Sequence, residues 1–86
     1  MLTNGQYVRH RMAPDILMGT VEEVEIQRGR VFYRFRQDPR LREPLSAIYG
    51  KHRFLDDELE PCDRPSDEYW ANINRRIGLL SRRAAA

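Results

Sequence analysis

Apolar and polar residues alternate along three early stretches of the chain, as they do in strands that bury one face. The sequence predicts strands over 6–12, 19–27 and 30–36, with a loop over 13–18. The core face of the first strand is expected to carry Val8, His10 and Met12. The alternation is cleanest in the third strand, whose expected core residues are Val31, Tyr33 and Phe35. The pattern is typical of an antiparallel sheet.

The second strand breaks its own alternation, because Val21 and Val24 fall on opposite faces of a regular strand. A β-bulge at Glu22-Glu23 returns both valines to one face and bends the strand. The next interruption, Arg28-Gly29, predicts a tight hairpin turn in which Gly29 takes a positive φ. Such irregularities give a short sheet the curvature that a small barrel requires.

The second half of the sheet is shorter and more interrupted. Two prolines predict a loop over 37–46, and a fourth strand with an internal break is expected over 47–54. A helical turn over 55–58 leads into a closing strand over 59–62. Because proline cannot donate to a strand ladder, Pro61 confines that strand to an edge or a strand end.

An amphipathic helix is predicted over 66–82. Ser66 is the expected N-cap, and Asp67 and Glu68 follow in the first turn, where the helix dipole favours acidic residues. Apolar residues recur at helical spacing on one stripe, formed by Trp70, Ile73, Ile77 and Leu80. Two alternatives stay open: the stripe packs on the open end of the chain's own barrel, or it docks on a protein partner or a second copy.

These elements predict a mainly β fold, a small five-stranded SH3-like barrel over 1–63 followed by a hinge and helix over 64–86. The helix belongs either to the same domain or to an appended interaction element. The strand openings G-Q-Y-V-R-H and G-T-V-E-E-V resemble the C-terminal Tudor-like domain of bacterial DNA-repair helicases. More loosely, they resemble the RNA-polymerase-interacting domain of transcription–repair coupling factors. The residues that carry the resemblance are Gly5, Val8, His10, Gly19 and Val21.

The resemblance implies a barrel of the Tudor-like or KOW-like type, which binds partners rather than transforming them. It covers the expected barrel and not the C-terminal helix. The chain departs from the pattern after His10, where these families have a short glycine-rich link and this sequence has a longer loop containing Pro14. The resemblance therefore bears on the fold more than on any particular partner.

Length and composition narrow the class of protein further. The chain has 86 residues, enough for one domain with one compact core. No apolar run approaches the roughly 20 residues that span a bilayer, and no N-terminal signal pattern is present, so we expect a cytoplasmic protein without membrane contact. Cys62 is the only cysteine, which excludes an internal disulfide and a cysteine-rich zinc site.

Charge is unevenly distributed, although the net charge is only +2. Residues 1–53 hold ten basic and six acidic residues, for a net charge of +4. Residues 54–68 hold one basic and seven acidic residues, for −6, and residues 69–86 hold four basic and no acidic residues, for +4. Fourteen of the fifteen basic residues are arginine, which suits bidentate contacts with phosphate, although arginine-rich codon usage gives the same bias.

An arginine-rich strand face is the candidate nucleic-acid surface. Arginines beside exposed aromatic rings suit nucleic acid, with the charges on phosphates and the rings on bases. The candidate residues are Arg9, Arg11, Phe32, Arg34 and Arg36. The alternative is a solvated face whose charge is balanced by the glutamates of the neighbouring strand, Glu22, Glu23 and Glu25. An aromatic cage for methylated lysine or arginine is a weaker alternative, formed by Tyr7, Phe32, Tyr33, Tyr49 and Phe54.

Catalytic chemistry has little support in the sequence. His10 and His52 are far apart and have no obvious nucleophile or metal-ligand partner, and His10 is expected to be a hydrogen-bonded core residue. No phosphate loop and no H-E-x-x-H motif is present. We therefore expect no enzyme activity, no cofactor and no metal.

The sequence thus predicts a non-catalytic protein-interaction adaptor in bacterial, phage or plasmid nucleic-acid metabolism. Its partner is expected to be a protein, or a second copy engaged through the C-terminal helix, with DNA or RNA as a further ligand. Two alternatives stay open. One is a nucleic-acid-binding module that uses the arginine-rich strand face. The other is a small regulator or inhibitor from a mobile element, which follows only from the small size.

Overall fold

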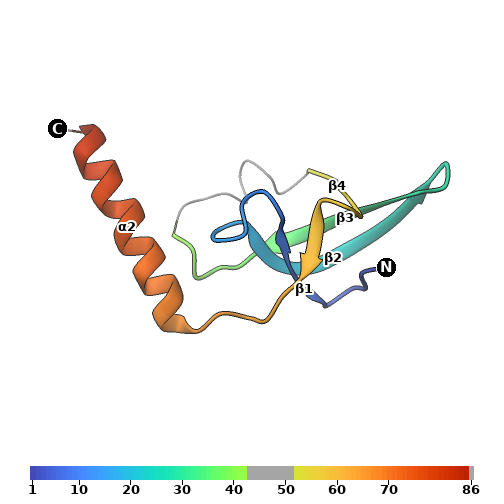
Figure 1. Cartoon of the computed structure of the whole chain (residues 1–86), viewed down its shortest axis with the longest axis horizontal. Coiled ribbons are helices and arrows are strands. Elements are labelled where there is room, and N and C mark those ends of the chain that lie inside the picture. Colours follow the sequence, from blue (N-terminus) through green and yellow to red (C-terminus); the bar gives the residue numbers. More distant parts are fainter. Residues whose placement is uncertain (43–51, 86) are drawn as a thin grey trace.

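The chain folds into one open antiparallel sheet followed by one C-terminal helix, so it is mainly β (Figure 1). The computed structural model describes residues 1–42 and 52–85, with side chains described as far as residue 78. The strand order is β4-β3-β2-β1-β5. The elements are β1 (Tyr7–His10), β2 (Met18–Gln27), β3 (Arg30–Gln37), β4 (Phe54–Leu55), β5 (Leu59–Pro61) and α2 (Asp67–Ala85).

The first strand is shorter than its pattern predicts. It ends at His10, and the chain then turns instead of continuing to residue 12. The backbone N–H groups of Met12 and Ala13 donate to the Nδ1 atom and the carbonyl oxygen of His10, which closes the turn. Met12 was expected on the core face, but its side chain is 87% exposed. That expectation was wrong because alternation does not say where a strand stops.

The predicted bulge is confirmed. The register between β2 and β3 shifts between Val21 and Glu23, so that Val21 lies opposite Phe35 and Val24 lies opposite Tyr33. Both valines therefore face the same side as the aromatic residues of β3. Val21 is almost completely buried as a result.

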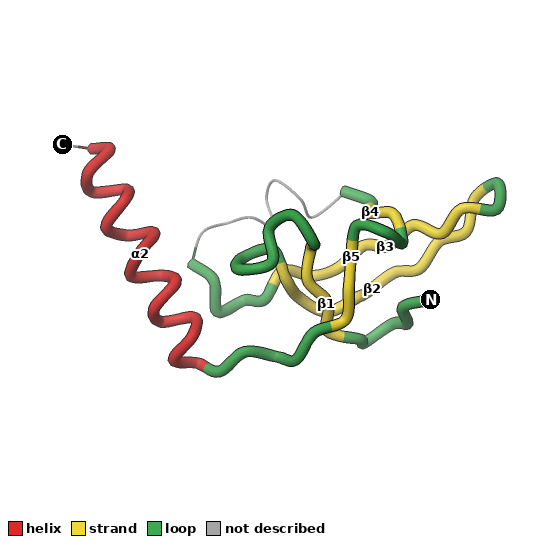
Figure 2. The backbone as a smooth tube through the Cα atoms, in the orientation of Figure 1, coloured by secondary structure: helices red, strands yellow, loops and turns green. Residues whose placement is uncertain are grey.

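The hairpin turn at Arg28-Gly29 is also confirmed. Both residues have positive φ, 51° for Arg28 and 77° for Gly29, as a type I′ turn requires. This turn matches the right-handed twist of the strands that it joins. The hairpin is long, and its tip extends well past the neighbouring strands (Figures 1 and 2).

Most of the predicted fourth strand lies outside the described residues. Its described end, Phe54–Leu55, pairs with β3 at Phe32 and Tyr33. The helical turn expected next is present as a turn in which the Glu58 N–H donates to the Leu55 carbonyl oxygen at 3.0 Å. β5 then pairs with β1 and is an edge strand that ends at Pro61, as predicted.

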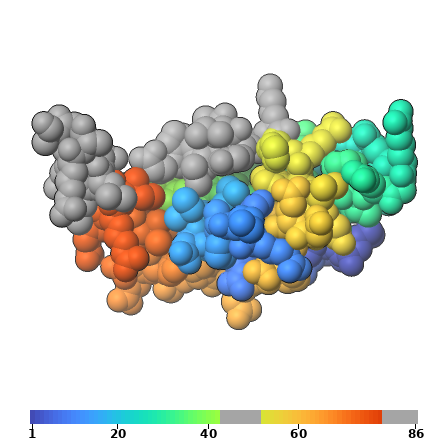
Figure 3. Space-filling view, turned by 45° about the horizontal axis from the view of Figure 1, so that its top comes forward, coloured from blue at the N-terminus to red at the C-terminus, as the bar shows by residue number. Residues whose placement is uncertain are grey.

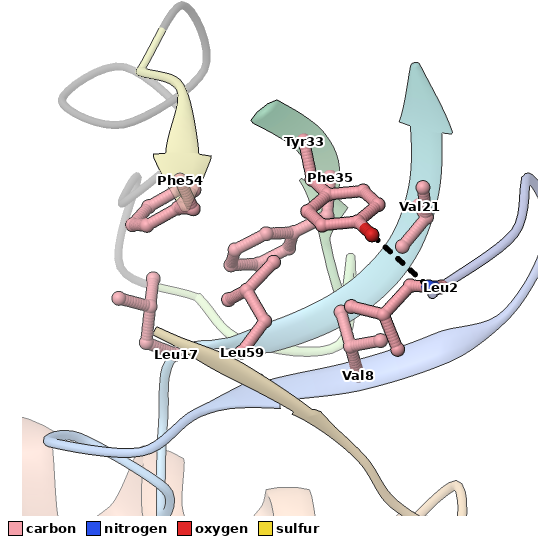
Figure 4. Packing of buried hydrophobic residues seen from close by; sticks show 8 residues of the cluster. All are labelled: Leu2, Val8, Leu17, Val21, Tyr33, Phe35, Phe54 and Leu59. Atoms are coloured by element: carbon pink, nitrogen blue, oxygen red, sulfur yellow. Dashed lines mark hydrogen bonds between the residues drawn. The ribbon is translucent and has the colours of Figure 1, made fainter. Parts of the chain in front are cut away.

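The main core lies on one face of the sheet (Figure 4). Every strand contributes to it, and the first residues of the chain close it. Tyr33 links these parts, because its hydroxyl accepts a hydrogen bond from the Leu2 N–H and donates one to Asp56. The buried residues are Leu2, Val8, Leu17, Val21, Tyr33, Phe35, Phe54 and Leu59.

The molecule is elongated, with principal extents of 49 × 25 × 18 Å. The β2–β3 turn and the start of α2 lie at opposite ends in the space-filling view (Figure 3). Within the described part of the chain, α2 is not apolar enough to cross a membrane.

Two glycines should respond to alanine in opposite ways. A Cβ atom at Gly19 would lie 1.8 Å from the Arg36 carbonyl oxygen, so we expect Gly19→Ala to destabilise the fold by about 1–3 kcal/mol. A Cβ atom at Gly78 meets nothing within 4 Å, and Gly78→Ala should stabilise α2 by up to about 1 kcal/mol. Urea unfolding measures both, and an unchanged midpoint for Gly19→Ala would contradict the close approach of β2 and β3.

Candidate functional site

The second face of the sheet carries a smaller apolar cluster, on which α2 packs. Adjacent strand residues point to opposite faces, so Tyr7 and Met18 face away from the main core. Trp70 packs with Met18 and Leu41 and is only 1% exposed. The half-buried residues at the margin of this cluster are Tyr7, Tyr69, Ile73 and Ile77.

The helix begins where the sequence predicts. The Ser66 hydroxyl accepts a hydrogen bond from the Tyr69 N–H at 3.2 Å, as an N-cap does. Asp67 and Glu68 occupy the first turn. This start brings Trp70 onto the sheet at the first full turn of the helix.

An ion pair between a buried aspartate and a half-buried arginine lies beside Trp70. The guanidinium of Arg40 donates to both carboxylate oxygens of Asp38, from Nε at 3.0 Å and from Nη2 at 2.8 Å. The Tyr7 hydroxyl donates to the same carboxylate at 2.8 Å. The remaining Arg40 nitrogen, Nη1, donates to Asp67 in the first turn of α2 at 2.9 Å. One arginine therefore joins the loop after β3 to the helix.

These contacts shift the pKa of each group. Burial alone raises the pKa of Asp38, but hydrogen bonds from Arg40 and Tyr7 and the charge of Arg40 outweigh it and lower that pKa to about 2. Burial, and then the hydrogen bond to Asp38, raises the pKa of Tyr7. The hydrogen bond to Asp38 raises the pKa of Arg40. The carboxylate is therefore ionised and the phenol is neutral at any physiological pH.

Further contacts hold the helix along its first half. The Arg40 guanidinium lies over the Trp70 ring, 5.8 Å from its centroid. The Asn74 side chain donates to the Arg40 carbonyl oxygen at 2.8 Å and accepts from the Arg42 N–H at 2.9 Å. The stripe residues Trp70, Ile73 and Ile77 thus pack on the chain's own cluster with Met18 and Leu41, on a face of the sheet rather than on the open end of a barrel. Leu80, the fourth stripe residue, lies beyond the described side chains.

The candidate nucleic-acid face consists largely of ion pairs. Cross-strand register places Arg34 opposite Glu23 and Arg9 opposite Glu60. Their charged atoms lie 3.1 Å and 2.9 Å apart. Arg36 is paired more loosely with Glu22, at 3.9 Å, and Arg53 with Glu25, at 3.1 Å. Most of the charge on this face is therefore balanced, as the alternative interpretation expected.

Of the other two candidates, Phe32 lies among those pairs and Arg11 lies outside the sheet. Phe32 is half-buried on β3, directly across from Glu25. Arg11 is exposed in the turn after β1, outside the sheet. The proposed set is therefore not one continuous basic surface.

The aromatic residues of the alternative cage are separated. Tyr33 and Phe54 belong to the main core, whereas Tyr7 faces the other side and binds Asp38. Phe32 is next to Tyr33 on β3 and so faces away from it. Tyr49 lies outside the described residues. Rings on opposite faces of a sheet do not form a cage.

No catalytic constellation emerges within the described ranges. No group of three or more His, Cys, Asp or Glu side chains there could hold a metal ion. The His10 ring contacts Glu58 at 3.4 Å and meets Phe54 edge to face, as a hydrogen-bonded residue at the core margin. Burial raises the pKa of the Cys62 thiol, which lines a shallow hollow of about 350 Å³, and this keeps the thiol protonated.

The pattern of the sequence did not single out the far end of the hairpin as a site. β2 has ten residues and β1 has four, so the outer half of β2 extends beyond its neighbour. Ile26 lies in that half and is 65% exposed. The predicted strands, seven and nine residues long, gave little sign of this overhang, and an isoleucine in an alternating strand normally indicates core.

Comparison of the chain with protein-family models, with curated proteins and with solved structures found no match.

Truncating Trp70 should release the helix from the sheet. We expect Trp70→Ala to lower the free energy of unfolding by about 3–5 kcal/mol, because the indole fills the centre of the smaller cluster. Asn72→Ala, on the exposed side of the same turn, should change it by less than about 0.5 kcal/mol. Urea unfolding followed by far-UV circular dichroism compares the two. Equal effects would show that α2 does not depend on this contact.

The Asp38 pair predicts a defined acid sensitivity. The folded pKa of about 2 lies below the ordinary value of 3.8, so the stabilisation is complete above about pH 4 and is lost as the pH falls toward 2. A difference of this size is worth about 2 kcal/mol. Asp38→Asn should remove this contribution and flatten the stability profile between pH 4 and 2. If the free energy of unfolding changed with pH in the same way for the native and variant proteins, the lowered pKa of Asp38 would be contradicted.

Proposed function

We propose that the chain is a non-catalytic protein-interaction adaptor that binds its protein partner along the outer half of the β2–β3 hairpin. The observation that carries the proposal is a stretch of strand edge that no described residue pairs, beside an exposed isoleucine. Exposed edges of this kind are templates for an added strand.

The free edge follows from the pairing of β2. This strand pairs with β1 only at Met18–Thr20, and Val21 exchanges hydrogen bonds with Gly5 and Gln6. From Glu22 to Gln27, no described residue pairs with β2 on that side. An extended partner segment has six residues of edge to pair with there.

Ile26 supplies an apolar contact for such a segment. It lies opposite the half-buried Val31, on the same face as the main core but beyond it. A second copy of the chain is a poor occupant, because antiparallel pairing of this edge with itself brings the glutamates at 22, 23 and 25 of one copy close to those of the other. A different protein, with an apolar residue facing Ile26, fits better.

The strand order supports an SH3-like barrel as the fold. β5 returns to pair with β1, and a single tight turn at 56–58 separates it from β4.

The resemblance to Tudor-like domains supports a role in bacterial, phage or plasmid nucleic-acid metabolism. The regulator or inhibitor from a mobile element stays an alternative. The ion pairs of Arg9, Arg34 and Arg36 weigh against the strand face as a nucleic-acid surface.

A photo-crosslinking residue at position 26 tests the proposal in cells that carry the gene. We expect Ile26→benzoylphenylalanine to give a discrete crosslinked species on irradiation, because the partner's strand lies against this side chain. Mass spectrometry identifies the captured protein, and the purified pair is then retested for direct binding.

Position 12 provides the matched control, because Met12 is apolar and, at 87%, even more exposed than Ile26. Met12→benzoylphenylalanine should give no discrete species. Capture of the same proteins from both positions, or from neither, would refute the hairpin as the docking surface.

A further inference from the structure

Ion pairs with glutamates balance most of the positive charge on the sheet, whereas the arginines of the helix have no such partners among the described residues. The glutamates of β2 and β5 hold Arg9, Arg34, Arg36 and Arg53. After Glu68, by contrast, no acidic residue follows, and residues 69–86 contain four arginines. Other arginines also lack an ion pair within the described residues, but they are scattered over turns and loops: Arg11, Arg28, Arg30, Arg42 and Arg64. On α2, by contrast, all four arginines follow the last acidic residue within one helix.

Arg75 and Arg76 lie on the outer side of this helix. Both are exposed, and neither forms an ion pair or hydrogen bond with any residue in the described part of the chain. Asn74 and Ile77 face the loop and the sheet. Since each helical residue is rotated by about 100° from the last, positions 75 and 76 fall on the side away from them.

The helix repeats this arrangement one heptad later. Arg82 follows Arg75 by seven residues, and Arg83 follows Arg76 by the same number. An α-helix returns to within about 20° of its starting direction over seven residues and advances about 10 Å. The four positions thus form two parallel rows about 100° apart along the outer side of α2.

We propose that this outer side of α2 binds the phosphate backbone of double-stranded DNA. A groove about 12 Å wide admits an α-helix and presents phosphates along both of its walls, which suits a helix with arginine positions along its outer side. Guanidinium groups bind phosphate in a bidentate manner. The contact is a backbone contact and carries no sequence preference of its own.

The acidic segment of a second copy is a weaker occupant, because four of its seven carboxylates are already engaged, Glu58 among them through the Leu55 N–H. Asp56 accepts from Tyr33, Glu60 is paired with Arg9, and Asp67 is paired with Arg40. The proposal is also independent of the hairpin, which lies at the other end of the molecule (Figure 3).

Fluorescence anisotropy with a labelled DNA duplex of mixed sequence tests the inference on the full chain. We expect salt-dependent binding that Arg75→Ala/Arg76→Ala weakens at least tenfold at low salt. The slope of log affinity against log salt concentration should fall by about 2, because two phosphate contacts are lost. Both residues are exposed, so circular dichroism should show an unchanged fold.

Arg28→Ala/Arg30→Ala is the matched control. It removes the same charge from two arginines that are also exposed and also lack a described ion pair, at the hairpin end. Its affinity should change by less than threefold, with an unchanged slope. Equal losses from both variants, no duplex binding by the native chain, or displacement of duplex by poly-glutamate as readily as by unlabelled duplex would each overturn the proposal.

Discussion

The arrangement of sheet and helix depends on one buried carboxylate. Asp38, directly after β3, is 5% exposed, and a charge so buried is tolerated only where its oxygens are fully satisfied. Arg40 and Tyr7 satisfy them, and the same guanidinium extends to Asp67 and covers the Trp70 ring. Loss of Arg40 would leave the charge unpaired and free the first turns of α2. The first half of α2 thus packs against the sheet through this contact.

Features governed by a few adjacent residues could be predicted from the sequence. The bulge at Glu22-Glu23, the turn at Arg28-Gly29 and the Ser66 cap all form where expected. In each case the conformation is set locally, by the φ and ψ values that the residues prefer or by one side-chain hydrogen bond. The end of β1 could not be predicted, because it depends on His10 accepting a hydrogen bond from a residue beyond the strand.

Features that join distant segments could be predicted only in part. Helical spacing identified an apolar stripe around Trp70, but a stripe does not reveal what covers it. Asp38 and Arg40 lay in a segment that composition assigned to a polar loop. No pattern in the neighbouring residues indicated that they connect this loop to α2. The strand arginines were expected to carry free charge or to be balanced by glutamates. The cross-strand register places Arg9 and Arg34 opposite glutamates, so their charges are balanced. Alternation alone does not give this register.

The position of Trp70 has a spectroscopic consequence. It is the only tryptophan of the chain and lies between helix and sheet, whereas the aromatic residues of the main core are Tyr33, Phe35 and Phe54. Indole emission therefore reports the packing of α2 on the sheet, while far-UV dichroism of the strands reports the sheet itself. The protein contains its own probe for whether the helix detaches before the sheet unfolds or together with it, and no added label is needed.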